Sequence, residues 1–329
     1  MGAHQTADEL RYRYEAMVES GPAPTTVGGL IDAWLEHCRS VYPARGGLSG
    51  GSSTATNARN ACRELKLLYA DLPLTELRLR HLEAARLAQI EAGLSRRTIN
   101  DRQARIRQML RWARGQGWLP DSAELVGGLG GLSRERKEHG LTVYESEPKR
   151  TPTLEEIVRV LREPRLPAVV ADMMRVQVRT GMRSGELVTM RGIDLDISAS
   201  PWLYTPAHHK TSYLGRRRLI QIGPRSQLVL LPYLKDGLLF TVHRGPRKGG
   251  GWRVSAYYRA MRRASERAGV DMGGAGQSLR RRALTEAARQ SGNETAQRIA
   301  GHGSVRTTES YVGPEATMAG ATPFIDSWG

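Results

Sequence analysis

The chain has 329 residues and carries 49 lysines and arginines against 33 aspartates and glutamates, a formal net charge of +16. That length allows two domains of roughly 100–200 residues each, and such a basic excess favours nucleic acid as the partner. A membrane-spanning protein is not expected, because the longest aliphatic run, Leu228–Leu231, is far shorter than the roughly 18 residues of a membrane span. The N-terminal segment lacks the apolar core of a signal peptide. Two cysteines are too few for a disulfide framework or a zinc site made of cysteines.

The first part of the chain has the apolar periodicity of helices. Residues 1–24 end in Gly-Pro-Ala-Pro, a breaker sequence, and are expected to form an N-terminal extension. Apolar side chains that recur every three or four residues then predict helices from Thr25, over about 54–70 and 78–92, and from a cap at Ser95 to about residue 118. We therefore expect residues 25–120 to be an all-α domain.

The last of these helices carries two kinds of side chain. Ile99, Ile106, Met109, Leu110 and Ala113 form one apolar stripe, which we expect in the core. Arginines cover much of the remaining surface, either as a solvated face or as a face that follows DNA phosphates. The arginines of this helix considered for DNA contact are Arg96, Arg97, Arg102 and Arg105.

The second part begins after a stretch rich in glycine and charge, residues 121–150, which we expect to be a linker. Thr153 and Glu156 have the spacing of a helix capping box. Further helices are predicted at about 168–180, 254–268, 279–290 and 295–300, and two short strands at 202–205 and 218–222. The fold class is therefore mainly α with a small β-sheet, with an α+β second domain over 151–312 and a tail over 313–329.

Four short segments of the second part have the residue types of a phosphate site. The first reads Thr-Gly-Met-Arg-Ser-Gly-Glu-Leu and places Arg183 at a helix entrance, where the helix N-terminus adds positive potential. The alternative is a helix cap with a surface arginine. The second places Lys210 in the turn between the two strands, followed by Arg216 and Arg217, which we consider further DNA contacts.

Lys210 is noteworthy because the chain has only six lysines and 43 arginines. Lysine can give up a proton, which arginine cannot. The neighbouring His208 and His209 do not predict a metal site, because adjacent side chains of a strand point to opposite faces.

The third and fourth segments lie near the end of the chain. Gln277-Ser-Leu-Arg280 opens a helix after a glycine-rich loop. Gly301 is a predicted helix stop that leaves His302 in a turn, and Tyr311 follows nine residues later.

These four segments together resemble the catalytic boxes of the tyrosine recombinases, the phage integrase family. The first matches the family pattern TGxRxxEL, Lys210 stands where the family has its hairpin lysine, QSLR supplies the arginine of the HxLR box, and AGH with Tyr311 keeps the spacing of the last box. The N-terminal part, including LSRRTINDRQARIRQMLRWARGQGWLP, resembles the family's SAM-like core-binding domain. The resemblance covers about residues 25–312.

The resemblance implies cleavage and rejoining of DNA strands through a 3′-phosphotyrosyl intermediate, without a metal or cofactor. Tyr311 would be the nucleophile, Arg183 and Arg280 would hold the phosphate oxygens, His302 would add a hydrogen bond, and Lys210 would protonate the leaving 5′-oxygen. Glu186 is expected to orient other groups. Two positions depart from the family pattern. Gln277 stands where a histidine is usual, and a glutamine side chain cannot accept a proton as a base. Arg281 replaces a second histidine.

The resemblance also implies partners. We expect double-stranded DNA at specific sites, a homo-tetramer assembled on two DNA sites, service to a mobile element, no membrane, and a cytoplasmic, nucleoid-associated location. The apolar tail is expected to pack on its own domain or on a neighbouring protomer. The alternatives are a catalytically impaired DNA-binding protein on the same scaffold, a type IB topoisomerase-like enzyme, and, for the charge alone, the arginine bias of a GC-rich genome.

Overall fold

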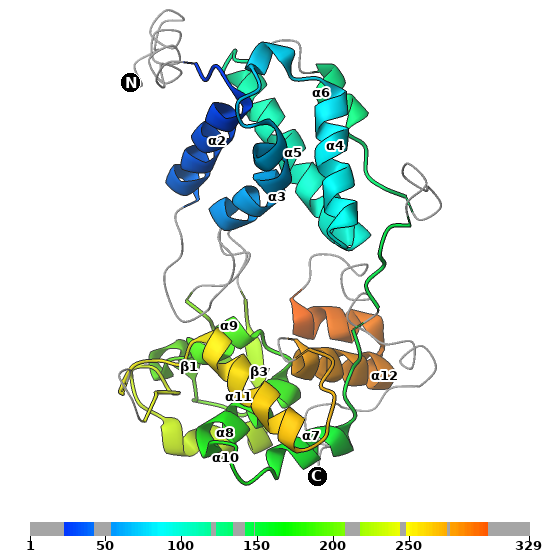
Figure 1. The fold of residues 1–329 in the computed structure, drawn as a ribbon. Coiled ribbons are helices and arrows are strands. Elements are labelled where there is room, and N and C mark those ends of the chain that lie inside the picture. Colours follow the sequence, from blue (N-terminus) through cyan, green and yellow to red (C-terminus); the bar gives the residue numbers. More distant parts are fainter. Residues whose placement is uncertain are drawn as a thin grey trace, which may run out of the picture. The chain divides into compact units, whose positions relative to one another are not determined.

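The computed structural model describes residues 23–42, 54–119, 123–133, 142–147, 149–207, 218–243, 248–274 and 277–301. The described chain divides into two compact units, one ending at Glu147 and the other beginning at Lys149. Figure 1 shows the helices of both units and the short strands, which occur only in the second among the described residues. The predicted fold class, mainly α with a small β-sheet, is confirmed.

The first unit consists of helices. They are α2 (Val27–Val41), α3 (Thr54–Tyr69), the 3-10 turn η1 (Leu74–Glu76), α4 (Leu79–Glu91), α5 (Arg96–Gly115) and α6 (Ala123–Gly128). The hydroxyl of Ser95 accepts a hydrogen bond from the Thr98 backbone N–H, which confirms the predicted cap of α5. The apolar stripe of α5 is fully buried and packs with α2 and α3 into one core, as predicted.

The segment expected as a linker contributes to this first core. Helix α6 lies within residues 121–150, and its Leu125 is buried together with Leu129 against α4 and α5. The Arg107 guanidinium of α5 donates to the Leu129 carbonyl. Residues 121–150 therefore include a helix that packs into the core, because buried leucines lie between the glycines.

The second unit has helices around a small sheet. The helices are α7 (Leu154–Leu161), α8 (Ala168–Thr180), α9 (Ser184–Val188), α10 (Pro224–Leu230), α11 (Val254–Arg267) and α12 (Ser278–Ala300), and the 3-10 turns are η2 (Gly192–Asp194) and η4 (Leu231–Tyr233). The capping box at Thr153 and Glu156 is present in both directions, as predicted. Helix α8 packs against both α10 and α12, so it runs through the centre of this unit.

The sheet has three antiparallel strands in the order β1 (Leu195–Asp196), β2 (Trp202–Tyr204) and β3 (Ile220–Ile222). The two predicted strands are confirmed, whereas the two-residue β1 is too short for its alternation to be recognised. Ile220 and Ile222 are buried while the residue between them is exposed, so one face of β3 belongs to the core.

Helix α12 consists of two helical stretches that are joined by a kink. Its backbone leaves the helical region at Gly292, with φ 80° and ψ 166°, a conformation that is open almost only to glycine. This is why the sequence predicted two helices, 279–290 and 295–300. The end of α12 at Gly301, in the left-handed conformation, is the predicted stop. Among the described residues, no helix is both long and apolar enough to cross a membrane.

Candidate active site in the second unit

The turn between α8 and α9 places Arg183. Gly181 ends α8 with φ 63°, and the chain turns there so that Arg183 becomes the N-cap of α9. A side chain at Gly181 would also approach Ile299 of α12, because the Cβ position lies 3.2 Å from its Cγ2. The glycine thus serves the turn and the close approach of α12.

Arg183 and Glu186 form a capping box. The Arg183 backbone N–H donates to Glu186 Oε2 at 2.7 Å, and its Nη1 donates to Oε1 at 3.0 Å. The Arg183 side chain keeps 21% of its surface exposed. Arg183 is therefore both a cap residue and a partly accessible cation, which joins the two interpretations of this position.

Glu186 is a buried carboxylate among arginines. Burial by itself raises the pKa of Glu186, but Arg218, Arg183, its hydrogen bond from the Arg183 backbone and Arg280 outweigh that effect, so the pKa lies below its usual value. Glu186 is 3% exposed and Arg218 Nε lies 3.5 Å from its Oε1. The carboxylate is thus ionised and orients its neighbours, as expected for this residue.

Arg280 joins two of the predicted segments. It lies in the first turn of α12 and is 1% exposed. Its Nη1 donates to the Gly181 carbonyl at 2.6 Å and its Nη2 to the Ala300 carbonyl at 2.7 Å. One side chain therefore fastens the turn that carries Arg183 to the last turn of α12, directly before His302.

Gln277 lies at the N-cap of α12, where its carbonyl accepts from the Arg281 N–H at 2.8 Å and its side chain makes no cap hydrogen bond. Arg281 is buried and has a structural contact: its Nη2 donates to the carbonyls of Arg150, at 2.9 Å, and Gly273, at 2.6 Å. Arg281 thus ties the start of the second unit to the loop that leads into Gln277.

The other predicted site residues lie outside the described residues: Lys210, Arg216, Arg217, His302 and Tyr311. In the part of the chain that the structure describes, no group of three or more histidine, cysteine, aspartate or glutamate side chains is arranged to hold a metal ion.

The arginines of α5 differ from one another. Arg96 pairs with Glu145, and Arg102 Nη1 lies 2.9 Å from the buried Glu64 Oε2. Arg97 is exposed, and Arg105 is half-buried. The predicted DNA-contacting arginines therefore divide into paired ones that support the core of the first unit and at least one that faces solvent.

Arg218 was not among the predicted site residues. The signal that could have found it is the alternation that leads into β3, because Arg218 precedes Ile220 and Ile222 at the same spacing of two and all three residues are buried. An arginine on the buried face of a strand needs a partner of opposite charge.

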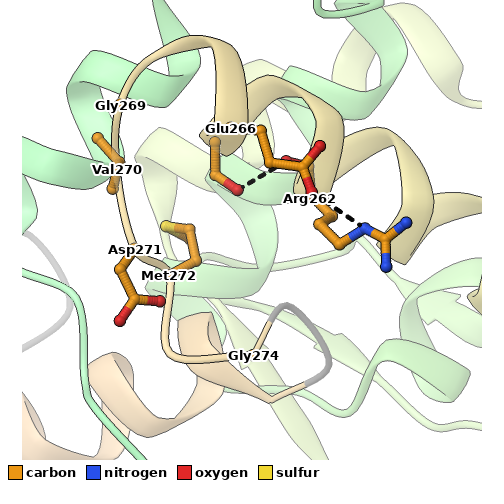
Figure 2. A pocket seen from close by; sticks show the side chains of 8 residues that line it. Arg262, Glu266, Gly269, Val270, Asp271, Met272 and Gly274 are labelled. Atoms are coloured by element: carbon orange, nitrogen blue, oxygen red, sulfur yellow. Dashed lines mark hydrogen bonds and ion pairs between the residues drawn. The ribbon is translucent and has the colours of Figure 1, made fainter.

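A separate hollow of about 440 Å³ lies at the end of α11 (Figure 2). Arg262 and Glu266 form an ion pair at its wall, at 3.4 Å. Its lining contains neither Glu186 nor any of the predicted site residues. The lining residues are Arg262, Ser265, Glu266, Gly269, Val270, Asp271, Met272 and Gly274.

Comparison with known structures shows the same fold. A lambda integrase dimer bound to a COC′ core site is 16% identical, with a TM-score of 0.67, and the match covers 94% of this chain and 87% of that one. A lambda integrase tetramer bound to a Holliday junction is 16% identical, with a TM-score of 0.64 and coverage of 97% and 90%. The Tn1549 transposon integrase in complex with circular intermediate DNA is 17% identical, with a TM-score of 0.64 and coverage of 88% and 96%.

No curated protein sequence matches the chain. The sequence profile of the phage integrase family, in contrast, matches residues 151–317, just over half of the chain. That range contains the arginine cluster around Glu186 and all four predicted catalytic segments. The chain therefore belongs to the phage integrase family, the tyrosine recombinases.

Proposed function

We propose that this protein is a site-specific DNA recombinase that cleaves and rejoins strands through a 3′-phosphotyrosyl intermediate, with Tyr311 as the nucleophile. The observation that carries the proposal is the clustering of Arg183 and Arg280 around one buried carboxylate. Two guanidinium groups fastened to the same turns are suited to a phosphate whose charge grows in the transition state.

In the proposed reaction, the Tyr311 hydroxyl oxygen attacks the scissile phosphorus and the bond to the 5′-oxygen breaks. Lys210 gives a proton to the leaving 5′-oxygen, while the phosphorus keeps its bond to the 3′-oxygen of the DNA and gains one to the tyrosine oxygen. The attack of a 5′-hydroxyl on the phosphotyrosine reverses these steps. Because the energy of the broken phosphodiester bond is kept in the phosphotyrosyl bond, the rejoining step needs no nucleoside triphosphate.

Gln277 has a restricted role in this scheme. It can donate a hydrogen bond to a phosphate oxygen but cannot accept the proton of Tyr311. With Lys210 assigned as the acid, His302 is the member of the proposed set that can accept this proton at neutral pH. We therefore assign Gln277 to phosphate positioning and His302 to both the phosphate and the nucleophile.

Duplex DNA is the proposed partner, held mainly through phosphates. Of the arginines considered, we assign Arg97, Arg105, Arg216 and Arg217 to DNA and treat Arg96 and Arg102 as supports of the first unit, because carboxylates already pair with them. The similar structures hold lambda integrase on a core site and as a tetramer on a Holliday junction, and a transposon integrase on circular intermediate DNA. They support a tetramer on two sites and service to a mobile element for this chain.

The test is covalent capture. The full chain is incubated with a pool of short random duplexes, each with one nick, so that a cleaved end is released and the adduct accumulates. DNA that stays attached to protein after denaturation is then sequenced. We expect an adduct enriched in one sequence, and its complete loss in Tyr311→Phe without loss of DNA binding, because phenylalanine lacks the attacking oxygen.

A matched control is Tyr144→Phe, because Tyr144 is 55% exposed and lies in the first unit. This variant should keep the adduct. An adduct formed by the Tyr311→Phe protein would overturn the assignment of the nucleophile. Adducts on unrelated sequences together with relaxation of supercoiled plasmid would instead indicate a topoisomerase-like enzyme.

Gln277 favours one further candidate function, a DNA-binding protein that has lost strand cleavage. The expected result for that protein is salt-sensitive retention of duplex DNA with no covalent product from the wild-type chain. The same capture experiment therefore separates the two functions.

A further inference from the structure

We propose that Arg218 is a positioning residue of the recombinase site: its buried guanidinium pairs with the Glu186 carboxylate and packs against the end of α12, which leads into His302. This inference rests on the proposed function for its catalytic consequence. Its electrostatic part concerns Glu186 alone and can be tested without DNA.

The first support is the place of Arg218 between two segments. It is 6% exposed and directly precedes the buried face of β3. Its Nε lies 3.5 Å from Glu186 Oε1, and its Nη1 lies 2.6 Å from the position that a Cβ of Gly301 would occupy. The guanidinium thus contacts the carboxylate of α9 on one side and the end of α12 on the other.

The second support is the balance of charge. Three guanidinium groups, those of Arg183, Arg218 and Arg280, act on the Glu186 carboxylate, and Arg218 is the strongest of the cations that lower its pKa. Tyr204 approaches from β2, where its hydroxyl donates to the Glu186 carbonyl at 2.8 Å. Among the described residues the cluster therefore has an excess of positive charge, which an incoming phosphodiester would offset.

The third support is the cost of burying such a group. Burial lowers the pKa of Arg218, the Glu186 carboxylate raises it, and Arg183 lowers it further. The Arg218 Nη2 atom is buried and has no hydrogen-bond partner among the described residues. If position 218 only had to fill space, an apolar side chain would be at least as stable there, because it needs no desolvation of a charge. An arginine is explained if its charge is needed to pair with Glu186 beside the end of α12.

The fourth support is that Arg218 and Arg280 act on the same turn. Arg280 donates to the Ala300 carbonyl, and Arg218 packs against Gly301, the next residue. Two buried arginines therefore hold the end of α12 from different elements. Loss of Arg218 would remove one of the two buried guanidinium groups at this end, so we expect the chain to leave Gly301 toward His302 along a less precisely fixed path.

The experiment compares three variants of the full chain. Arg218→Met removes the charge and keeps the length, Arg218→Lys restores a charge, and Arg86→Met is the matched control. Arg86 has the same 6% exposure but lies in the first unit, where it donates to the Gly130 carbonyl. Each variant is measured for its thermal unfolding midpoint across pH and for its rate of covalent adduct formation on the captured duplex.

The pH dependence separates the electrostatic role from a merely structural one. Because the pKa of Glu186 is depressed in the folded chain, its contribution to stability is present above the unfolded value, about 4.3, and is lost as pH falls through the folded value. Arg218→Met should therefore lower the unfolding midpoint most at neutral pH, and the difference from wild type should shrink in acid, where Glu186 is protonated in both. Arg86→Met should show only a small dependence on acid pH, because its carboxylate neighbour Glu83 lies 3.8 Å away and is 37% exposed.

Two further measurements complete the design. In a Glu186→Gln background, Arg218→Met should have a small effect that no longer depends on acid pH. At saturating DNA, Arg218→Met should slow adduct formation about tenfold to a hundredfold, as expected for a displaced catalytic group, with unchanged DNA affinity and partial rescue by Arg218→Lys. Arg86→Met should leave this rate unchanged.

The inference is overturned if Arg218→Met forms adduct at the wild-type rate, or if its effect on stability is the same at every pH and in the Glu186→Gln background. Failure of the proposed function looks different, because the wild-type chain would then form no adduct at all. In that case the pH-dependent coupling between Arg218 and Glu186 still decides the electrostatic part.

Discussion

At the scale of single residues, the arginines of this protein differ in burial and in hydrogen-bond partners, and therefore in role. Arg183 is partly exposed beside Glu186, whereas Arg280 is buried and spends two hydrogen bonds on backbone carbonyls. Arg281, its neighbour, holds the carbonyls of Arg150 and Gly273. Position and partners, and not residue type, thus distinguish the two proposed phosphate ligands, Arg183 and Arg280, which both act on Glu186, from the neighbouring Arg281.

Gln277→His is the residue-scale prediction. Gln277 lies at the N-cap of α12 within the same turn as Arg280, and an imidazole there can accept the proton of Tyr311, which the amide cannot. We expect the rate of adduct formation to rise, most strongly above about pH 6.5, where a histidine of ordinary pKa is neutral. Single-turnover rates across pH measure this effect.

Gln277→Glu is the control for Gln277→His, because it adds an acceptor that also repels the phosphate, and it should slow the reaction. Equal rates for Gln277→His and wild type at every pH would contradict this prediction and show that a second acceptor beside His302 does not speed cleavage.

At the scale of elements, local patterns predicted most helices because they depend on neighbours a few residues away. The caps at Ser95 and Thr153 and the stop at Gly301 are of this kind. The start of α9 was predicted from the helix entrance at Arg183, whereas α10 escaped prediction because its seven residues are fewer than the about 11–18 over which an apolar period can be recognised. Residues 121–150 were interpreted as a linker because glycine was weighted above the buried leucines.

Helix α5 offers the prediction at this scale, a comparison of Arg97 and Arg102. Arg97 is exposed, so Arg97→Ala should weaken binding to duplex DNA, reduce the salt dependence by about 0.9 in log–log slope for one lost phosphate contact, and leave stability nearly unchanged. Arg102 is 14% exposed and pairs with Glu64, which also accepts from Gln89 in the core. Arg102→Met should therefore lower the free energy of unfolding by about 3 kcal/mol, because it leaves a buried carboxylate with fewer partners.

The two α5 measurements are a DNA titration at several salt concentrations and urea unfolding. The comparison fails if Arg102→Met binds DNA less tightly while keeping its stability, because Arg102 would then be the phosphate contact. Arg63 also pairs with Glu64 and is largely exposed, so its replacement by alanine is a suitable mild variant.

At the scale of the whole molecule, the positive charge is unevenly distributed along the chain. Residues 129–329 hold 32 of the 49 basic residues but 19 of the 33 acidic ones. The part of the sequence that carries the family match thus also carries most of the excess charge. Much of the arginine in the described structure is nevertheless paired with carboxylates, so the net charge overstates the number of groups available to DNA.

The whole-molecule prediction concerns salt. If the full chain contacts six to ten phosphates, as a DNA-binding protein of this type would, its affinity for duplex DNA should fall by about a thousandfold or more between 50 and 200 mM salt. Fluorescence anisotropy with a labelled duplex measures this loss. An affinity that hardly changes with salt would show that the arginines are mostly engaged within the protein and that other contacts dominate.

The sequence by itself determined most of the helices, the two longer strands, the caps and stops, and the family, because each of these depends on short-range patterns or on the order and spacing of a few motifs. Only the tertiary structure decided what the arginines do. Arg280 donates to a carbonyl 99 residues away, and Arg102 pairs with a carboxylate 38 residues away. Such partners are brought together by packing, so no local pattern identifies them. The alternation before β3 could indicate that Arg218 is buried, but only the fold shows that its partner is Glu186.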